Sequence, residues 1–287
     1  MLHEILFSLL GFVGDIIVDD DSVFKVKDGF DLLQESERTL VNKIVPLGWY
    51  YVKLNEIIQR YDISWGQTSK PCVYLASAVQ GMSDLLTEYV ADVAYLEQLL
   101  LAEGPIPLSQ VLQHMQKYLL VFPELHSMFL VLETGRIAGC RLLDYFSTYN
   151  TGVPVLKEVL DRIVLRLRVV FVKQCFSWMI HGELEDPGLE FFIQSKLSSI
   201  NQSDYRNIDS TTTTANSSTN MINTTITDKS TTSSIASTST TTTGTGNSFD
   251  WTSSYSLALE MIPESHISAR IAGKILFAGK AVKLLQS

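Results

Sequence analysis

Cysteine is scarce in this sequence: Cys72, Cys140 and Cys175 are the only three among 287 residues. They lie far apart and in apolar surroundings. That arrangement suits neither a disulfide framework nor a zinc site, because both need cysteines or histidines at characteristic spacings. We therefore expect three buried thiols in a reducing compartment such as the cytoplasm.

Positive charge is also in short supply. Lysine and arginine number 22 against 31 acidic residues, which gives a net charge of −9 and a pI near 5.0. This balance argues against nucleic acid or an anionic membrane surface as a partner. Arg162, Arg166 and Arg168 come closest to a basic patch, and helical spacing places the first two on one face. A solvated helix face is the simpler interpretation of these three residues.

Long apolar runs are missing as well. No uninterrupted apolar stretch has the length that crosses a bilayer. The N-terminal run from 1 to 18 lacks the positive start of a secretory signal and carries Glu4 and Asp15. We interpret it as a core helix followed by a strand or loop.

Patterns of catalytic or metal-binding residues are equally hard to find. No two histidines form a zinc-like pair, and none stands at a recognisable spacing from serine, cysteine or aspartate. The histidines are His3, His114, His126, His181 and His266. Four carboxylates cluster between 183 and 190, where we expect them to be solvated or to cap a helix rather than to form an acid/base pair. They are Glu183, Glu185, Asp186 and Glu190.

The segment from Gly273 to Lys280 superficially resembles a phosphate-binding loop. Five residues rather than four separate its glycines, and Ala281 stands where serine or threonine is required. Its apolar period indicates a helix, whose amides are already bonded. We predict no cofactor, no metal and no enzymatic activity.

What the sequence does contain is helical periodicity on a composition that is 46% hydrophobic. Apolar residues recur at steps of four and three from Glu35 to Tyr61, where Pro46 could introduce a kink. The same steps run from Cys72 to Leu101, which would suit either a coiled coil or a helix of a bundle, and we favour the bundle.

Further helices are predicted along the rest of the chain. One runs from Ser109 to Phe122, Pro123 is expected to break it, and a separate helix follows to Leu132. A short helix is predicted over 137–149, and the longest one from Pro154 to Trp178. A last helix is marked by Ile267, Ile271, Ile275 and Val282. Alternation typical of a strand occurs only around 23–26, so the predicted fold is all-α, an elongated bundle of antiparallel helices.

Composition changes abruptly within the C-terminal third. From 197 to 249 serine, threonine and asparagine dominate, with too few large apolar residues to offset the entropy of ordering the chain. We predict a helical bundle over 1–196, a long disordered Ser/Thr/Asn-rich insert over 197–249, and a continuation of the bundle over 250–287. The insert could be phosphorylated, but low-complexity filler is the simpler interpretation.

The stretch from Lys173 to Ile193 predicts a helix-turn-helix corner. Gly182 ends the first helix, and Asp186 with Pro187 is the usual opening of a second one. The aromatic side chains around this corner are either core residues or interface anchors, and their spacing favours the core. They are Trp178, Phe191 and Phe192.

The same stretch carries a resemblance to a known family. Its pattern closely resembles the N-terminal GRIP motif of the gamma-tubulin complex components. The matching residues are Trp178, Met179, His181, Gly182, Leu184, Asp186, Pro187, Glu190, Phe191, Phe192 and Ile193.

A second match lies downstream of the polar tract and is similar to the next segment of those proteins. Its residues are Ile262, Pro263, Ile267, Ile271, Ala272, Lys274, Ile275, Leu276, Phe277, Gly279 and Lys280. The opening Met1 to Leu6, with Phe122 and Pro123, resembles one component of the family in particular. The resemblance covers nearly the whole chain outside the polar tract.

The resemblance implies a structural role. In this family the N-terminal helical half associates side by side with neighbouring components, and a separate C-terminal half binds gamma-tubulin, so that a ring of gamma-tubulins templates microtubule growth. The C-terminal half is missing from residues 1–287. The implied partners are therefore other complex components, with gamma-tubulin and microtubule minus ends reached through them, at centrosomes or spindle poles. Alternatives are a short form that blocks ring assembly and an unrelated helical scaffold or adaptor.

Overall fold

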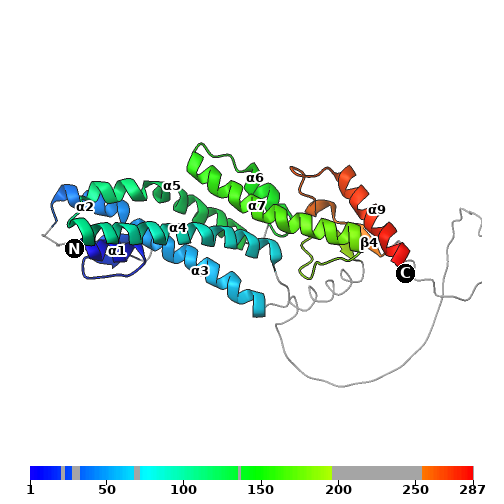
Figure 1. Cartoon of the computed structure of the whole chain (residues 1–287), viewed down its shortest axis with the longest axis horizontal. Coiled ribbons are helices and arrows are strands. Elements are labelled where there is room, and N and C mark those ends of the chain that lie inside the picture. The colour runs from blue at the N-terminus through cyan, green and yellow to red at the C-terminus, as the bar shows by residue number, and fades with distance from the viewer. Residues whose placement is uncertain (21–22, 28–32, 68–71, 135–136, 196–253, 287) are drawn as a thin grey trace, which may run out of the picture. The chain divides into compact units, whose positions relative to one another are not determined.

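The computed structural model describes residues 1–20, 23–27, 33–67, 72–134, 137–195 and 254–286 (Figure 1). The chain divides into two compact units, one of Met1–Gln194 with Leu257–Ser287 and one of Ser195–Ser256. The insert predicted over 197–249 lies outside the described residues. The architecture below is that of the first unit.

The N-terminal part builds a small core around a hairpin. Helix α1 (Leu2–Leu9) precedes strands β1 (Ile17–Asp19) and β2 (Phe24–Val26), which pair antiparallel with Ile17 opposite Val26. Helix α2 (Glu35–Ile44) covers this hairpin. Glu4 links α1 to the segment that leads into the hairpin, because its carboxylate accepts a 2.7 Å hydrogen bond from the Ile16 amide. The predicted N-terminal helix, and the strand expected near 23–26, are both confirmed.

Five further helices form the bundle. They are α3 (Pro46–Gln67), α4 (Val73–Glu103), α5 (Leu108–Glu133), α6 (Arg141–Thr148) and α7 (Pro154–Phe176). Helix α4 packs against α3, α5 and α7 and runs antiparallel to them (Figure 1). The all-α prediction is confirmed, and the periodic segment after Cys72 is a bundle helix.

The contact between α4 and α7 is close at Gly81. A Cβ atom at Gly81 would lie 2.9 Å from Ile163 Cγ1 of α7. On the flank of the same contact, Arg162 binds Glu88 and Arg166 binds Asp84. These two arginines therefore cross-link two helices, and their interpretation as a merely solvated face was incomplete.

Prolines delimit the helices differently from the sequence-based expectation. Pro46 begins α3 after α2 has ended at Ile44, so there are two helices instead of one kinked helix. Pro123 lies inside the continuous helix α5, and the predicted break there was wrong. Proline removes one helical hydrogen bond, and the complete burial of Phe122 and Leu125 beside it favours continuing the helix. Helix α4, with 31 residues, is longer than α7, with 23, contrary to prediction.

The C-terminal part adds shorter elements. Helix α7 runs directly into a π-helical turn, η1 (Ser177–His181). Strands β3 (Ile193–Ser195) and β4 (Tyr255–Leu257), which were not predicted, form a two-stranded sheet, followed by the 3₁₀ turn η3 (Leu259–Met261). Helix α9 (Ala269–Gln286) packs against η1, as Figure 1 shows at the C-terminal end of the chain. Across the described ranges, no helix combines the length and the apolar character that crossing a membrane requires.

Candidate functional site

Trp178 joins the two sequence motifs. It lies in η1, is fully buried, and donates a 3.0 Å hydrogen bond from Nε1 to the carbonyl oxygen of Ile275 in α9. A π-helical turn adds a residue to the helix and so rotates the side chains that follow. The first motif thus begins with an indole that is hydrogen-bonded to the second motif.

Two glycines allow the close approach of α9 to η1. A Cβ atom on Gly279 would lie 2.2 Å from Trp178 Cε2, so only glycine fits there without movement. Gly182 ends η1 with a left-handed backbone, φ +61°, and a Cβ there would lie 3.2 Å from the backbone nitrogen of Lys283. We name this contact of η1 with α9, through Trp178, Gly182, Ile275 and Gly279, the motif junction.

Asp186 organises the turn that follows. Its two carboxylate oxygens accept hydrogen bonds from the amides of Glu190 (2.9 Å) and Phe191 (2.8 Å). The amides belong to a turn that leads into β3, in which Leu189 has φ +57°, so the helix predicted after Pro187 was wrong. Burial raises the pKa of Asp186, and the two amide hydrogen bonds oppose that rise.

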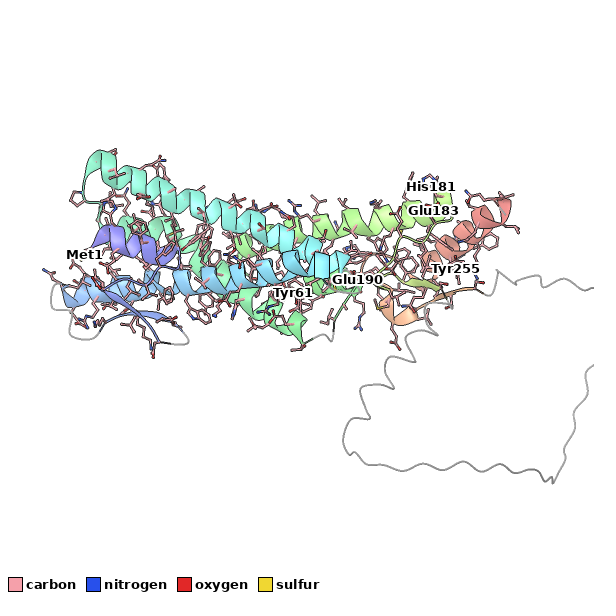
Figure 2. All side chains as sticks on the ribbon, turned by 90° about the horizontal axis from the view of Figure 1, so that it is seen from below. Met1, Tyr61, His181, Glu183, Glu190 and Tyr255 are labelled. Atoms are coloured by element: carbon pink, nitrogen blue, oxygen red, sulfur yellow. The ribbon has the colours of Figure 1, made fainter. Side chains whose placement is uncertain are left out.

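Glu190 caps a helix that is distant in sequence. Its side chain is labelled in Figure 2. The carboxylate is buried and accepts a 3.3 Å hydrogen bond from the amide of Tyr74 in the first turn of α4. Burial raises the pKa of Glu190 to about 7, opposed by hydrogen bonds from the Tyr74 and Val73 amides. Glu183 and Glu185 are exposed and Glu190 caps a helix, as expected, whereas Asp186 is buried and binds the amides of a turn, contrary to the expectation that it is solvated or caps a helix.

The aromatic residues of the corner form core. Phe191 and Phe192 are fully buried with ring centroids 4.3 Å apart, and both lie within about 6 Å of Phe171 in α7. Together with the buried Trp178, they confirm the core interpretation over that of exposed interface anchors.

Two parts of the site were not foreseen from the sequence. Tyr74 donates a 2.6 Å hydrogen bond to Gln174 Oε1, and Gln174 Nε2 donates to the carbonyl of Glu185, so that α4, α7 and the turn share one buried polar network. Gly139, with φ +64°, allows the Cys140 amide to donate to the Glu190 carbonyl at 2.9 Å. A glycine one residue before a cysteine gives no signal of this contact, because its partner is distant in sequence.

The remaining motif residues line the surface of this region to different degrees. Met179, Leu184, Ile267, Ile275, Leu276 and Lys280 are half-buried, while Pro187 and Lys274 are exposed. Their role in binding stays a prediction.

The described residues hold no group of three histidine, cysteine or carboxylate side chains that could bind a metal ion. Cys140 and Cys175 are buried, and burial raises the pKa of the Cys175 thiol to about 12, so it is not a ready nucleophile. Cys72 is exposed at the start of α4, contrary to the expectation that all three thiols are buried. The chemistry of this region is packing and hydrogen bonding between segments distant in sequence.

Comparison with known proteins defines the class. The chain belongs to the family described as Gamma tubulin complex component N-terminal, which matches residues 2–287. This confirms the family resemblance carried by the two motifs.

Within the family, the similar proteins are gamma-tubulin complex components 4. The chain is 29% identical to that of Arabidopsis thaliana and 31% identical to the homolog of Medicago truncatula, covering 100% of this chain and 40% and 39% of those proteins. It is 26% identical to Gamma-tubulin complex component 4 of Homo sapiens, covering 43% of that protein. The chain thus spans about two fifths of the length of these relatives.

Proposed function

We propose that residues 1–287 form the lateral-assembly part of a gamma-tubulin complex subunit, which holds neighbouring components side by side for microtubule nucleation. The match of the family over residues 2–287 is the observation that carries this proposal. The helical bundle supports it, because a packed framework with the two motifs locked together offers fixed surfaces to neighbours.

The proposed partners follow from the same reasoning. They are other gamma-tubulin complex components, with gamma-tubulin and microtubule minus ends reached indirectly through them. The proposed site of action is the microtubule-organising centre, at centrosomes or spindle poles, within the cytoplasm. Nucleic acid and membranes are not among the proposed partners, because the net charge of −9 disfavours both.

A quantitative pull-down tests this function. Tagged residues 1–287 are recovered from extract, and sibling components and gamma-tubulin are scored separately. We expect siblings in near-stoichiometric amount, with gamma-tubulin only in proportion to them. Recovery of neither by a chain shown to be folded and helical would favour the unrelated scaffold or adaptor instead.

A second candidate function concerns the chain acting alone. Because it spans about two fifths of its relatives, residues 1–287 supplied without the remainder would occupy a lateral position without the part that we expect to bind gamma-tubulin. This form would block ring assembly. Purified chain added to a nucleation assay should then lower nucleation with dose, and undiminished nucleation at saturating dose would exclude this candidate.

A further inference from the structure

Helix α7 carries a second apolar face. Five large apolar side chains recur at steps of four, three, four and four residues and are each more than half exposed. We name them the α7 stripe: Leu165 (61%), Val169 (63%), Val172 (62%), Phe176 (55%) and Ile180 (53%). At 3.6 residues per turn these positions share one side of the helix, and in the π-helical turn η1 a step of four from Phe176 keeps Ile180 on it.

The stripe lies opposite the face that holds α7 in the bundle. That inner face is formed by Leu156, Ile163, Leu167 and Phe171, all buried. In Figure 2, α7 forms the upper edge of its half of the view up to the labelled His181, with no described element drawn above it. Single exposed apolar residues are common on protein surfaces, but an aligned row of five marks an interaction surface.

The charged side chains that α7 and η1 themselves contribute between Arg162 and Gly182 all have one sign. From Arg162 to Gly182 the sequence contains four cations and no aspartate or glutamate, in a chain whose net charge is −9. Helical spacing places Lys173 along one border of the stripe and Arg168 along the other. Lys173 is 77% exposed and lies 3.8 Å from Glu185, and Arg168 donates to His266. A partner that covers the stripe therefore gains from acidic groups at its own borders.

We propose that the α7 stripe docks an amphipathic helix of another polypeptide, whose apolar seam is bordered by aspartate or glutamate. Steps of four and three produce a narrow ridge, which fits the seam of a facing helix. Only the identification of that polypeptide as another gamma-tubulin complex component rests on the proposed function.

An anionic membrane fits the stripe less well. Two of the four cations, Arg162 and Arg166, are already bound to Glu88 and Asp84 of α4, and these carboxylates lie on the same flank. This pairing offsets half of the positive charge that would attract an anionic lipid surface, whereas a docked helix needs only Lys173 and Arg168 at the immediate borders of the ridge.

Site-specific photocrosslinking in cells tests the proposal. A photoreactive amino acid replaces Val172 in the full chain, and adducts are identified by peptide mass spectrometry. The matched control carries the probe at Leu101, which is 71% exposed at the end of α4 and outside the stripe. We expect a specific adduct from Val172 to a helix with apolar residues at steps of three and four and acidic borders, and no such adduct from Leu101.

The alternative adducts overturn the docking proposal. These are a phospholipid adduct, an adduct within the same chain, an adduct to a helix without acidic borders, or no specific adduct at Val172. If the crosslinked segment is a helix of the predicted kind but belongs to a protein that is not a complex component, the docking proposal is supported and the proposed function is contradicted. If the crosslinked helix belongs to a sibling component, the docking proposal and the proposed function are both supported.

Two variants then separate the apolar and the ionic contributions. Val169→Glu, with the probe at Val172, should lower adduct yield at least about tenfold, because it places a charge in the seam, while Leu101→Glu leaves the yield unchanged. The double variant Arg168→Glu, Lys173→Glu should lower the adduct yield severalfold. This decrease should be smaller at high salt, because salt screens the charges. All four positions are solvent-exposed, so circular dichroism should show unchanged helix content. Unchanged yield in both stripe variants would overturn the proposal.

Discussion

At Gly279, a single hydrogen atom in place of a methyl group allows α9 to lie against the Trp178 indole. The same helix contains Gly273, around which a Cβ atom would meet nothing within 4 Å. A glycine-to-alanine substitution can therefore be compared within one helix at a crowded position, Gly279, and at an open position, Gly273.

We expect Gly279→Ala to lower the free energy of unfolding by about 1–3 kcal/mol, because the added methyl group must displace the indole or the helix. Gly273→Ala should instead raise it by about 0.5–1 kcal/mol, through better helix propensity and a less flexible unfolded chain. Urea unfolding followed by circular dichroism measures both. Equal effects of the two substitutions would show that the motif junction does not constrain α9.

Glu190 gives the fold a pH dependence. Its pKa is raised from 4.5 to about 7 in the folded state, so the folded chain holds this proton more tightly than the unfolded chain does. The resulting stabilisation is fully present below pH 4.5 and is lost as the pH rises through 7. Because each tenfold change in proton affinity corresponds to about 1.4 kcal/mol, the loss amounts to a few kcal/mol at most.

Glu190→Gln should therefore flatten the fall in stability between pH 5 and 7.5, since glutamine cannot ionise but can still accept from the Tyr74 amide. Chemical denaturation at several pH values measures this slope. The exposed Glu183→Gln serves as the matched control and should keep the slope of the original chain. An unchanged slope in Glu190→Gln would mean that other groups carry the pH dependence.

At the scale of the elements, α5 contains a residue that is unfavourable inside a helix. Pro123 lies inside it and leaves one helical carbonyl without its amide donor. We expect Pro123→Ala to raise the free energy of unfolding by about 1 kcal/mol, the gain in helix propensity being reduced by greater freedom of the unfolded chain. Thermal melts would show this as a higher Tm. A lower Tm would mean that packing of the half-buried proline ring outweighs its backbone cost.

Long helices were predictable because their apolar period is local. The prediction from Cys72 to Leu101 matches α4, Val73–Glu103, to within two residues at each end. The turn after Gly182 was not predictable in this way. Asp186 and Pro187 locally resemble a helix start, but the Glu190 carboxylate bonds an amide 116 residues away, and that tertiary contact determines the turn.

The outer face of α7 shows a related limit. Leu156, Ile163 and Leu167 recur at helical spacing and are buried. The exposed stripe has the same apolar character and nearly the same period, so hydrophobic pattern alone does not indicate which row faces the bundle. Burial in the folded chain separates them.

For the whole molecule, the proposed domain division predicts tolerance to deletion. Replacing 197–249 with a short Gly/Ser linker should preserve the helical bundle, because the flanking strands β3 and β4 pair with each other. Shortening the loop about fivefold should raise the free energy of unfolding by about 1–1.5 kcal/mol, according to the logarithmic cost of loop closure. Loss of helical circular dichroism in the shortened chain would show instead that this segment belongs to the fold.

The motif junction also has an optical consequence. The chain contains four tryptophans, Trp49, Trp65, Trp178 and Trp251. Replacing the other three with phenylalanine would leave Trp178 as the sole long-wavelength emitter, enclosed in protein and hydrogen-bonded to Ile275. Its fluorescence would shift to the red whenever α9 moved away from η1 and water reached the indole. Separation of α9 from η1 could then be followed in real time through the emission wavelength of one side chain.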